Sequence, residues 1–244
     1  HTRWHSVTGV QTCALPIFWR QYCFPAYLQW VGFGDHTERM PRLWEMNRHL
    51  VHHFAAMTGQ PELHAYARQF AEDRPEETDR DFPQAAQPAL TFLAPPEEAL
   101  PSALLSPTGI PGVPHAPRLR VFHDCGWAAM RTDLWRKERD VFLLFRSSPY
   151  GPVSHSHANN NCFVLHVGGE ALAVSSGYYD GYGSRHHWHW SHQTAAHTGL
   201  TFDGAGQVWG RYEDVGRIEG ESEEPDFLYL RGRADGSYGD RCRR

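Results

Sequence analysis

The feature that most constrains the fold is a series of short apolar runs that begins at Leu119. The runs are rich in β-branched and aromatic residues, and Gly or Pro separates them at intervals of about ten residues. They read LRVFHD, WAAMRTD, DVFLLFRSS, CFVLHVGG and EALAVSS, followed later by FLYLRGRA. Runs of this length and spacing are typical of antiparallel sandwiches and barrels, so we predict one of these architectures over residues 119–244.

A tight turn is predicted inside this series. Gly168 and Gly169 separate two of the runs, and two glycines between apolar runs favour a two-residue β-hairpin. Glu170, which follows them, is expected only to flank the turn.

Before these runs the periodicity is helical. Apolar residues recur at spacings of three and four between Leu43 and Met57, which indicates one buried helix face. A second helix is predicted over Glu62–Glu72, after the stop signal GQP. Two or three helices bury too little surface alone, so residues 18–73 are expected to end a larger helical domain. Residues 74–118, rich in Pro and acidic residues, are expected to form an extended connector.

Residues 1–17 are expected to be foreign to the natural protein. The stretch VTGVQTCALPI, from Val7 to Ile17, resembles the translation of a common short-read sequencing adapter. Segments of this kind are set aside before the fold is considered. We therefore expect the natural N-terminus to be missing, and the abrupt ending GDRCRR to mark a truncation as well.

Composition and charge exclude several classes of partner. The 23 Lys and Arg residues are outnumbered by 28 Asp and Glu residues, which is not the basic footprint of a nucleic-acid-binding protein. No run approaches the length of a membrane span, so neither nucleic acid nor membrane is expected as a partner. The five cysteines are scattered without a C-x-x-C pair, which predicts neither a disulfide framework nor a thiolate zinc site.

Histidines gather in residues 154–207, which hold eight of the 17 in the chain, mixed with Tyr, Trp and Gly. Imidazoles at this density point to a site for metal, proton transfer or sugar, since a merely solvated surface would contain more Lys and Glu. The first constellation is His155-Ser156-His157. In a strand, residues two apart face the same side, so both imidazoles could reach one metal, with His197 as the natural third nitrogen. The alternative is a pair of exposed strand histidines without a ligand.

The second constellation is the glycine-rich loop GYYDGYGSRHH, from Gly177 to His187. Its Arg185 could grip a carboxylate, as a guanidinium favours, and its tyrosines could stack on sugar rings. The alternative is packing or mobile surface. The residues that we predict to bind substrate here and just downstream are Tyr179, Tyr182, Arg185, His186 and Gln193.

At these residues the chain resembles the heparinase II/III-like polysaccharide lyases, a group that includes exo-acting alginate lyases. The shared motifs are GFGD at Gly32–Asp35, CGWAAMRTD, SHSHANNNCFVLHVGGEALAVSSGYYDGYGS, the W-x-x-QT-x-x-H string ending at His197, and DGAGQ ending at Gln207. They occur in the family's order over most of residues 18–210. This makes them specific for the superfamily and uninformative about the substrate.

The resemblance implies an α+β multidomain protein, in which the end of an (α/α) toroid precedes an antiparallel β-sandwich and the active site lies between them. Members cleave uronic-acid-containing polysaccharides by β-elimination. This reaction needs a neutralised carboxylate, a base for the C5 proton and an acid for the departing O4. The family's catalytic Tyr and Asn-His pair would lie upstream of Phe18, so the chain as written is expected to be inactive alone.

The resemblance also assigns roles to individual residues. His155 corresponds to the sandwich histidine that faces the active site, and His157 and His197 correspond to two zinc ligands. The family's third ligand, an Asp, is Ser175 here, and a hydroxyl is a poorer zinc ligand than a carboxylate. Asp180 or water could take its place, or the site could be empty. Zinc bound by His157, Ser175 and His197 is therefore the predicted cofactor.

The sequence thus predicts a lyase acting on alginate or a glycosaminoglycan, with an acidic polysaccharide as its partner and a periplasmic or secreted location ahead of a cytoplasmic one. One alternative is a carbohydrate-binding sandwich without turnover. Another is a cupin-like metal oxygenase, whose H-x-H is followed by a Glu three or four residues later. Here Asn160 and Asn161 occupy those positions.

Overall fold

The computed structural model describes residues 21–23, 33–35, 63, 65–66, 117–176, 180–212 and 215–242. The chain divides into two compact units, of which the first comprises His1–Tyr27 and Pro41–Ala116. Its described residues are helical and buried: Gln21, Tyr22, Cys23, Leu63, Ala65 and Tyr66. The rest of the predicted helical segment, the connector up to residue 116 and the adapter-like segment lie outside the described residues, so the domain boundaries remain predictions.

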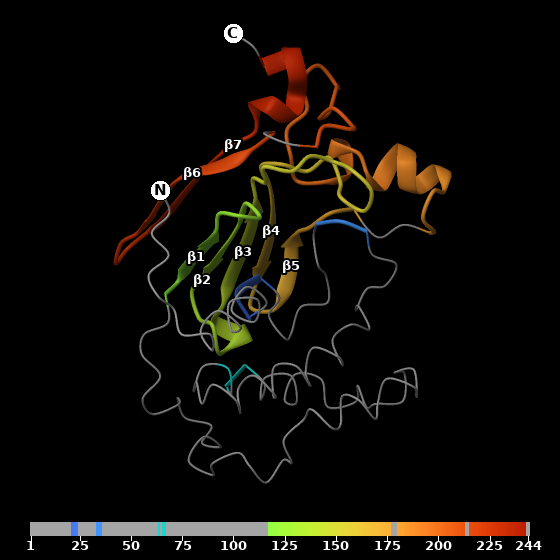
Figure 1. Ribbon diagram of the computed structural model, residues 1–244. Helices are drawn as coiled ribbons and strands as arrows, with labels where there is room; N and C mark the ends of the chain where they lie inside the picture. The colour runs from blue at the N-terminus through green and yellow to red at the C-terminus, as the bar shows by residue number, and fades with distance from the viewer. Residues whose placement is uncertain are drawn as a thin grey trace, which may run out of the picture. The chain divides into compact units, whose positions relative to one another are not determined.

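The second unit, here called the β unit, comprises Leu28–Met40 and Pro117–Arg244. Its main element is a five-stranded antiparallel sheet in which each strand pairs with the next along the chain (Figure 1). The strands are β1 Leu119–Phe122, β2 Trp127–Arg131, β3 Val141–Arg146, β4 Cys162–Val167 and β5 Glu170–Ala173. All five apolar runs before residue 177 therefore form strands, which confirms the prediction of antiparallel β-structure.

The hairpin between β4 and β5 also forms as predicted. Val167 pairs with Glu170, and the two residues between them have positive φ angles of 60° at Gly168 and 85° at Gly169. Positive φ at both central positions is the geometry that glycine adopts most readily. Glu170 itself is exposed, as a turn flank should be.

A two-stranded ribbon of β6 Arg217–Glu223 and β7 Leu228–Arg233 adds a second layer. Of the two, the apolar pattern predicted only β7. β6 reads RIEGESE, and its many charged residues gave no apolar pattern. Its Glu219 forms an ion pair with Arg217 in the same strand and another with Arg233 across the ribbon. The ribbon contacts the sheet at Phe145, where a side chain at Gly232 would come within 2.6 Å of the phenyl ring.

The apolar core lies on one face of the sheet. The register aligns Ala129, Leu144 and Val164 in one row, and all three are buried. The neighbouring row contains Phe142 and His166, which are equally inaccessible. Burying a Leu or Phe side chain contributes roughly 1.5–3 kcal/mol, so this face supplies much of the stability of the sheet.

A buried ion pair fixes the connection between β2 and β3, which includes the short helix η4 Lys137–Arg139. The Nε of Arg131 lies 2.5 Å from Oδ2 of Asp140, and the other oxygen of Asp140 accepts hydrogen bonds from the backbone N–H groups of Thr132 and Asp133. Removing either partner would leave an uncompensated buried charge. The Arg131 of the CGWAAMRTD motif is therefore structural.

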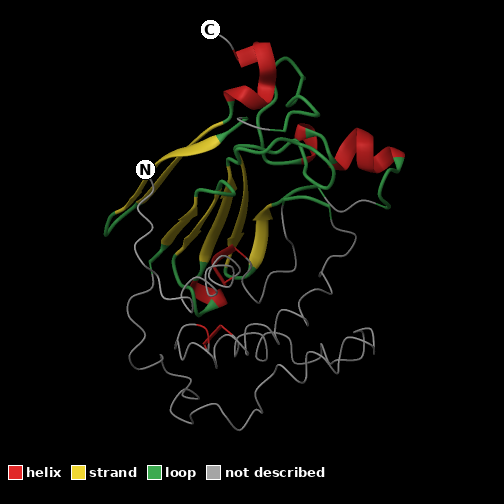
Figure 2. Ribbon diagram, in the orientation of Figure 1, coloured by secondary structure: helices red, strands yellow, loops and turns green. Residues whose placement is uncertain are grey.

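Short helical turns lie beyond the end of the sheet opposite η4 (Figure 2). They are η5 His187–Ser191, which has π-helical hydrogen bonding, and the 3-10 turns η6 Thr194–Ala196 and η7 Asp235–Cys242. Within the described ranges, none of the helices has the length and apolarity needed to cross a membrane.

His166 should make the β unit sensitive to acid. Burial lowers the pKa of its imidazole from 6.5 to about 4, although the nearby Asp140 carboxylate acts in the opposite direction. Because the folded-state pKa lies below the unfolded value, the neutral ring stabilises the fold above pH 6.5. This contribution, at most about 3 kcal/mol, should be lost as the pH falls toward 4.

His166→Leu, which removes the titrating group at similar volume, should flatten this pH dependence. The check is the unfolding free energy from urea titrations at pH 7, 6, 5 and 4.5, with the exposed His189→Leu as the control. An unchanged pH slope in His166→Leu would assign the acid sensitivity to other groups.

Candidate functional site

The His155-Ser156-His157 motif lies in the irregular loop between β3 and β4, where a strand was expected. Pro149 and Pro152 lack the N–H donors that a strand ladder requires, so pairing stops after β3. Ser154, immediately before the motif, has a φ of 52°, which non-glycine residues seldom adopt. The expectation that strand geometry brings the two imidazoles together is therefore wrong, and other contacts do so.

A buried guanidinium holds the loop on the end of β3. Arg146 donates hydrogen bonds to the carbonyl of His157 at 3.1 Å, to the carbonyl of Tyr150 at 3.3 Å and to the side-chain oxygen of Asn159. Burying such a charge is costly unless its donors are satisfied, and the loop carbonyls satisfy them. Arg146 thus fixes the backbone next to the second histidine of the motif.

Asn160 anchors the same loop from the other side. Its side chain exchanges hydrogen bonds with the backbone of Ser148, at 2.9 and 3.1 Å. Its backbone exchanges two more with the side-chain amide of Gln207, at 3.0 and 2.7 Å. The asparagine run and the glutamine of the DGAGQ motif are therefore scaffold for the histidines rather than groups that face a ligand.

Asp35 is the residue on which the histidines converge. Its Oδ1 atom lies 2.7 Å from Nε2 of His157, 2.7 Å from Nε2 of His187 and 3.2 Å from Nε2 of His192. Its Oδ2 atom lies 2.8 Å from Nδ1 of His155. We call these five residues the carboxylate–histidine cluster. Burial acts against the charge of Asp35, but the hydrogen bonds from His157, His187 and His155 outweigh it and lower the pKa of this carboxyl to about 2.

Residues of the GFGD motif hold Asp35 against the loop that contains His155. The N–H of Asp35 donates to the carbonyl of His155 at 3.0 Å, and the ring of Phe33 packs edge-on against Trp127 at 5.2 Å. Between them, Gly34 has a φ of 115°, and a side chain there would lie 3.1 Å from the His155 carbonyl. Glycine suits this backbone conformation, and any other residue would also crowd the His155 carbonyl.

The π-helical turn brings two further histidines to the cluster. The N–H of His192 donates to the carbonyl of His187 at 3.0 Å, a bond that spans five residues. The wider turn puts residues five apart on one side, so the two rings lie 3.9 Å apart between centroids. His187 is also held at its other nitrogen, Nδ1, which accepts a hydrogen bond from the N–H of Gly183 at 2.9 Å.

Four members of the cluster could hold a metal ion. Asp35, His157, His187 and His192 each offer one donor atom, and these atoms all lie within 4.8 Å of one another. Three imidazoles and a carboxylate form a donor set that transition metals use in proteins. Only His157 of this set belongs to the predicted zinc ligands.

The predicted ligands His157, Ser175 and His197 lie in contact, but as a chain rather than around a point. Nδ1 of His157 is 3.2 Å from Nε2 of His197, whereas the hydroxyl of Ser175 is 2.7 Å from the other nitrogen of His197, Nδ1. The two nitrogens of an imidazole point in different directions, so Ser175 does not face the place where the two rings meet. Asp180, the alternative to Ser175, is exposed and accepts a hydrogen bond from Ser184.

The predicted substrate-binding residues have different surroundings. The exposed ring of Tyr182 lies 4.9 Å from that of His155, and Arg185 and His186 are exposed on the same segment. The side-chain amide of Gln193 donates to the carbonyl of Trp188 at 2.7 Å, which occupies one of its donors. Tyr179 lies outside the described residues.

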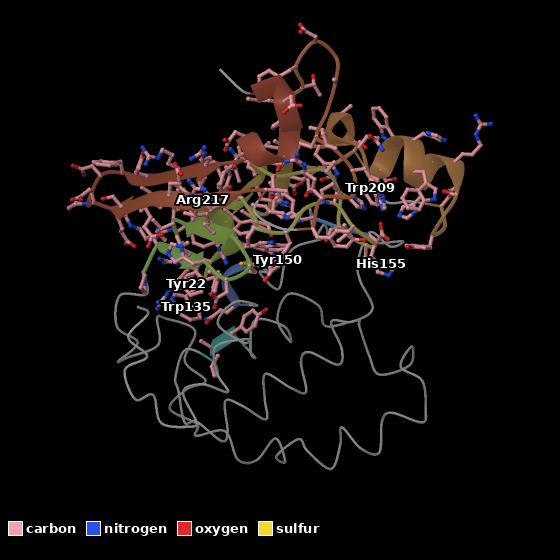
Figure 3. All side chains as sticks on the ribbon, turned by 45° about the horizontal axis from the view of Figure 1, so that its top comes forward. Tyr22, Trp135, Tyr150, His155, Trp209 and Arg217 are labelled. Atoms are coloured by element: carbon pink, nitrogen blue, oxygen red, sulfur yellow. The ribbon has the colours of Figure 1, made fainter. Side chains whose placement is uncertain are left out.

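Exposed indoles lie beside the cluster. Trp188 and Trp209 contact each other edge-on at 5.2 Å, and Trp209 stacks on the ring of His192 at 4.6 Å. Both indoles keep more than a third of their surface exposed, at 37% for Trp188 and 38% for Trp209. His155 and Trp209 lie on the same side of the β unit (Figure 3). An imidazole and a wide aromatic surface thus face solvent together.

Sequence reasoning missed Asp35, His187 and His192 as site residues. Asp35 served only as part of a recognition motif, and its partner His155 lies 120 residues away. The spacing of five between His187 and His192 matches neither a strand nor an α-helix and becomes meaningful only in a π turn. The available signal was that GFGD, one of the motifs shared with the family, contains a carboxylate, as the histidine-rich motifs contain imidazoles.

A family model described as Heparinase II/III-like, C-terminal, matches residues 114–238. Among solved structures, the chain is similar to heparan sulfate lyase HepC from Pedobacter heparinus, with a TM-score of 0.52 and 15% identity over 92% of this chain. It is also similar to a heparinase III gene product with methylated lysines, with a TM-score of 0.50 and 17% identity over 93% of this chain. At these identities the similarity concerns the fold.

The chain spans only 28% of the length of either structure. A comparison with curated proteins finds no match.

Gly34→Ala should weaken the attachment of Asp35 to the loop. The new methyl group would press on the His155 carbonyl in a backbone conformation that alanine disfavours, at a cost of about 1–3 kcal/mol. The measurement is the unfolding free energy in urea at pH 7. Gly204→Ala is the matched control, because Gly204 has a φ of 75° but its added side chain would have no neighbour within 4 Å. Equal losses in both variants would show that backbone conformation alone accounts for the effect.

Proposed function

Because the chain belongs to the heparinase II/III-like family of polysaccharide lyases, we propose that it forms part of an enzyme that cleaves uronic-acid-containing polysaccharide by β-elimination. The observation that carries the proposal is the setting of His155. Its side chain is 70% exposed while its Nδ1 atom is held by a carboxylate that is only 4% exposed. An imidazole whose Nδ1 atom is held by a carboxylate and whose Nε2 atom is accessible to solvent is suited to contact a substrate.

The chemistry assigns a limited part to His155. In β-elimination a base removes the C5 proton, the freed electron pair forms the C4–C5 double bond, and the O4 oxygen leaves and takes up a proton. The uronate carboxylate must be neutralised for C5 to become acidic. His155 presents Nε2 to solvent, because Nδ1 is occupied by Asp35. We assign to it one of two parts: with both nitrogens protonated the ring can orient and neutralise this carboxylate, and with a lone pair on Nε2 it can share in the proton transfer.

Exposed groups of the histidine-rich region supply the remaining features of an acidic-sugar site. No described residue forms an ion pair or hydrogen bond with Arg185, so its guanidinium is available for a carboxylate in a paired geometry. Tyr182, Trp188 and Trp209 offer aromatic faces on which sugar rings can stack. Alginate and glycosaminoglycans both fit this description, and heparan sulfate joins them as a candidate because of the solved lyases. A periplasmic or secreted location would give access to such polymers.

Zinc takes no step in this proposal, because the donors of His157, Ser175 and His197 do not face one point. A cupin-like oxygenase is disfavoured by the missing Glu and by the family. A carbohydrate-binding β unit without turnover remains the second candidate, favoured by the same exposed indoles.

Product absorbance separates the lyase from the binding module. Elimination creates a C4–C5 double bond that absorbs in the near ultraviolet, whereas binding leaves no such signal. We expect residues 18–244 alone to bind uronate oligomers without turnover, because the family's base and acid belong to the toroid and general acid–base groups each supply about 10²- to 10⁴-fold. A version extended by its natural upstream sequence should produce absorbance with alginate, hyaluronan, heparin or heparan sulfate. Binding without product in the extended protein would favour the second candidate.

Arg185→Ala should weaken the binding of uronate oligomers by roughly ten- to a hundredfold. Loss of one hydrogen bond to a charged group costs roughly 1.5–3 kcal/mol, and the proposed partner is the uronate carboxylate. Isothermal titration with uronate oligomers and with neutral oligomers of the same length measures the difference. Arg120→Ala, an exposed arginine on β1, is the matched control. An equal loss of affinity for neutral oligomers would contradict the carboxylate contact.

A further inference from the structure

We propose that the carboxylate of Asp35, rather than a metal ion, is the centre on which the histidines of this chain are assembled, and that Asp35 thereby positions His155 for the substrate. The second half rests on the proposed function, because it concerns the nitrogen that faces a sugar. The first half concerns only how the site is held together. The hydrogen-bond partners of each imidazole determine which of its nitrogens carries the proton.

His187 is fixed by a partner that can only donate. The N–H of Gly183 points at Nδ1 of His187 at 2.9 Å, so Nδ1 must accept. A neutral imidazole carries one proton, which therefore resides on Nε2 and is donated to Oδ1 of Asp35 at 2.7 Å. A metal would need the lone pair of that same Nε2 atom. His187 is therefore a hydrogen-bond donor to Asp35 and not a metal ligand.

His197 is fixed by a partner that can only accept. Its Nε2 atom lies 3.0 Å from the carbonyl oxygen of Ser191, so this nitrogen must carry the proton. Its Nδ1 atom then accepts the hydroxyl proton of Ser175 at 2.7 Å. In this arrangement Ser175 orients the His197 ring and has no lone pair directed at a shared metal position.

His157 follows from His197. Its Nδ1 atom lies 3.2 Å from Nε2 of His197, whose one proton is shared between the Ser191 carbonyl and this contact, so Nδ1 can only accept. The proton of His157 is then on its own Nε2 atom, which donates to Oδ1 of Asp35 at 2.7 Å. Thus His157 and His187 both direct N–H groups, and not lone pairs, at the position between the four donor atoms. The proton positions fit a carboxylate and do not fit a cation.

The charges agree with this assignment. The resemblance to the family implies a carboxylate as the third zinc ligand, and this chain has Ser175 at that position. The carboxylate of the site is instead Asp35, which arrives on the GFGD segment and faces the opposite side of the His157 ring. Its contacts are with imidazole nitrogens, at 2.7 Å from His157 and His187 and 2.8 Å from His155, and hydrogen bonds of this kind favour the charged form of a carboxylate. The negative charge of Asp35 thus attracts imidazole N–H groups. A metal cation in the same place would instead bind imidazole lone pairs.

The same carboxylate determines how His155 is presented. The Oδ2 atom of Asp35 accepts the Nδ1 proton of His155 at 2.8 Å, and the backbone of Asp35 donates to the carbonyl of the same residue at 3.0 Å. Two contacts from one residue fix both the ring and its backbone. The lone pair of His155 is therefore on Nε2, the solvent-facing atom. Asp35 is a positioning residue, since it acts through His155.

The first test measures zinc in residues 18–244 after dialysis against excess zinc and then against buffer. Elemental mass spectrometry should find well below one zinc per chain, and the melting temperature should be the same with zinc and with a chelator. One zinc per chain, removed by the chelator with a fall in melting temperature, would overturn the proposal. This test needs no variant and no activity.

The second test reads the proton positions by long-range ¹H–¹⁵N NMR of the histidine rings at pH 8. In the unsubstituted chain His155 should carry its proton on Nδ1, and His157 and His187 on Nε2. Asp35→Asn should turn His155 into a mixture of both forms, while Asp180→Asn, at an exposed carboxylate outside the cluster, should leave it unchanged. Protons on Nδ1 of His157 and His187 in the unsubstituted chain would overturn the assignment, whether or not Asp35→Asn folds.

Neither readout uses turnover. Failure of the lyase proposal would therefore leave these results intact, and stoichiometric zinc would overturn this inference without affecting the lyase proposal.

Discussion

A single buried carboxylate shared among four imidazoles is the interaction on which the site depends. Placing the charge of Asp35 at 4% exposure would be strongly unfavourable without partners. The two oxygens of Asp35 have different partners. Oδ1 forms hydrogen bonds with His157, His187 and His192, and Oδ2 forms one with His155. The arrangement draws together three separate segments of the chain, namely the GFGD segment, the loop after β3 and the π turn.

The support around this carboxylate is polar as well. The loop that presents His155 rests on the Arg146 guanidinium and on the paired hydrogen bonds of Asn160. Polar scaffolds of this kind tolerate few substitutions, since a removed partner leaves a buried donor or acceptor unsatisfied. The apolar sheet beneath supplies stability, while the hydrogen bonds above it determine where the imidazoles lie. The two requirements are met by different residues.

The sheet could be predicted from the sequence because its signals are local. β1 to β5 and the Gly168-Gly169 turn each reveal themselves within a few residues, by apolar runs and by glycine. β6 was not predicted because its sequence is charged rather than apolar, and its pairing with β7, which includes the Glu219–Arg233 ion pair, is not visible in a single segment. The cluster was predictable only in part. The histidine density indicated a site, and His155 and His157 were identified. Asp35 was missed because its contacts are with residues more than a hundred positions away in the sequence. His187 and His192 were missed because a single π turn has no recognisable sequence periodicity.

The matched family region begins at residue 114, so it leaves out the segment that carries Asp35. A protein that begins at that boundary would retain β1 to β7 and lose Asp35, the carboxylate that binds the histidines of the cluster. The modular unit of this protein is therefore discontinuous in sequence, since it needs a tripeptide that lies about eighty residues before the sheet begins. Transfer of the sandwich alone onto another helical partner would deliver the fold without the organised site. The organised site thus requires both segments, although most of the residues between them, Pro41–Ala116, belong to the other unit.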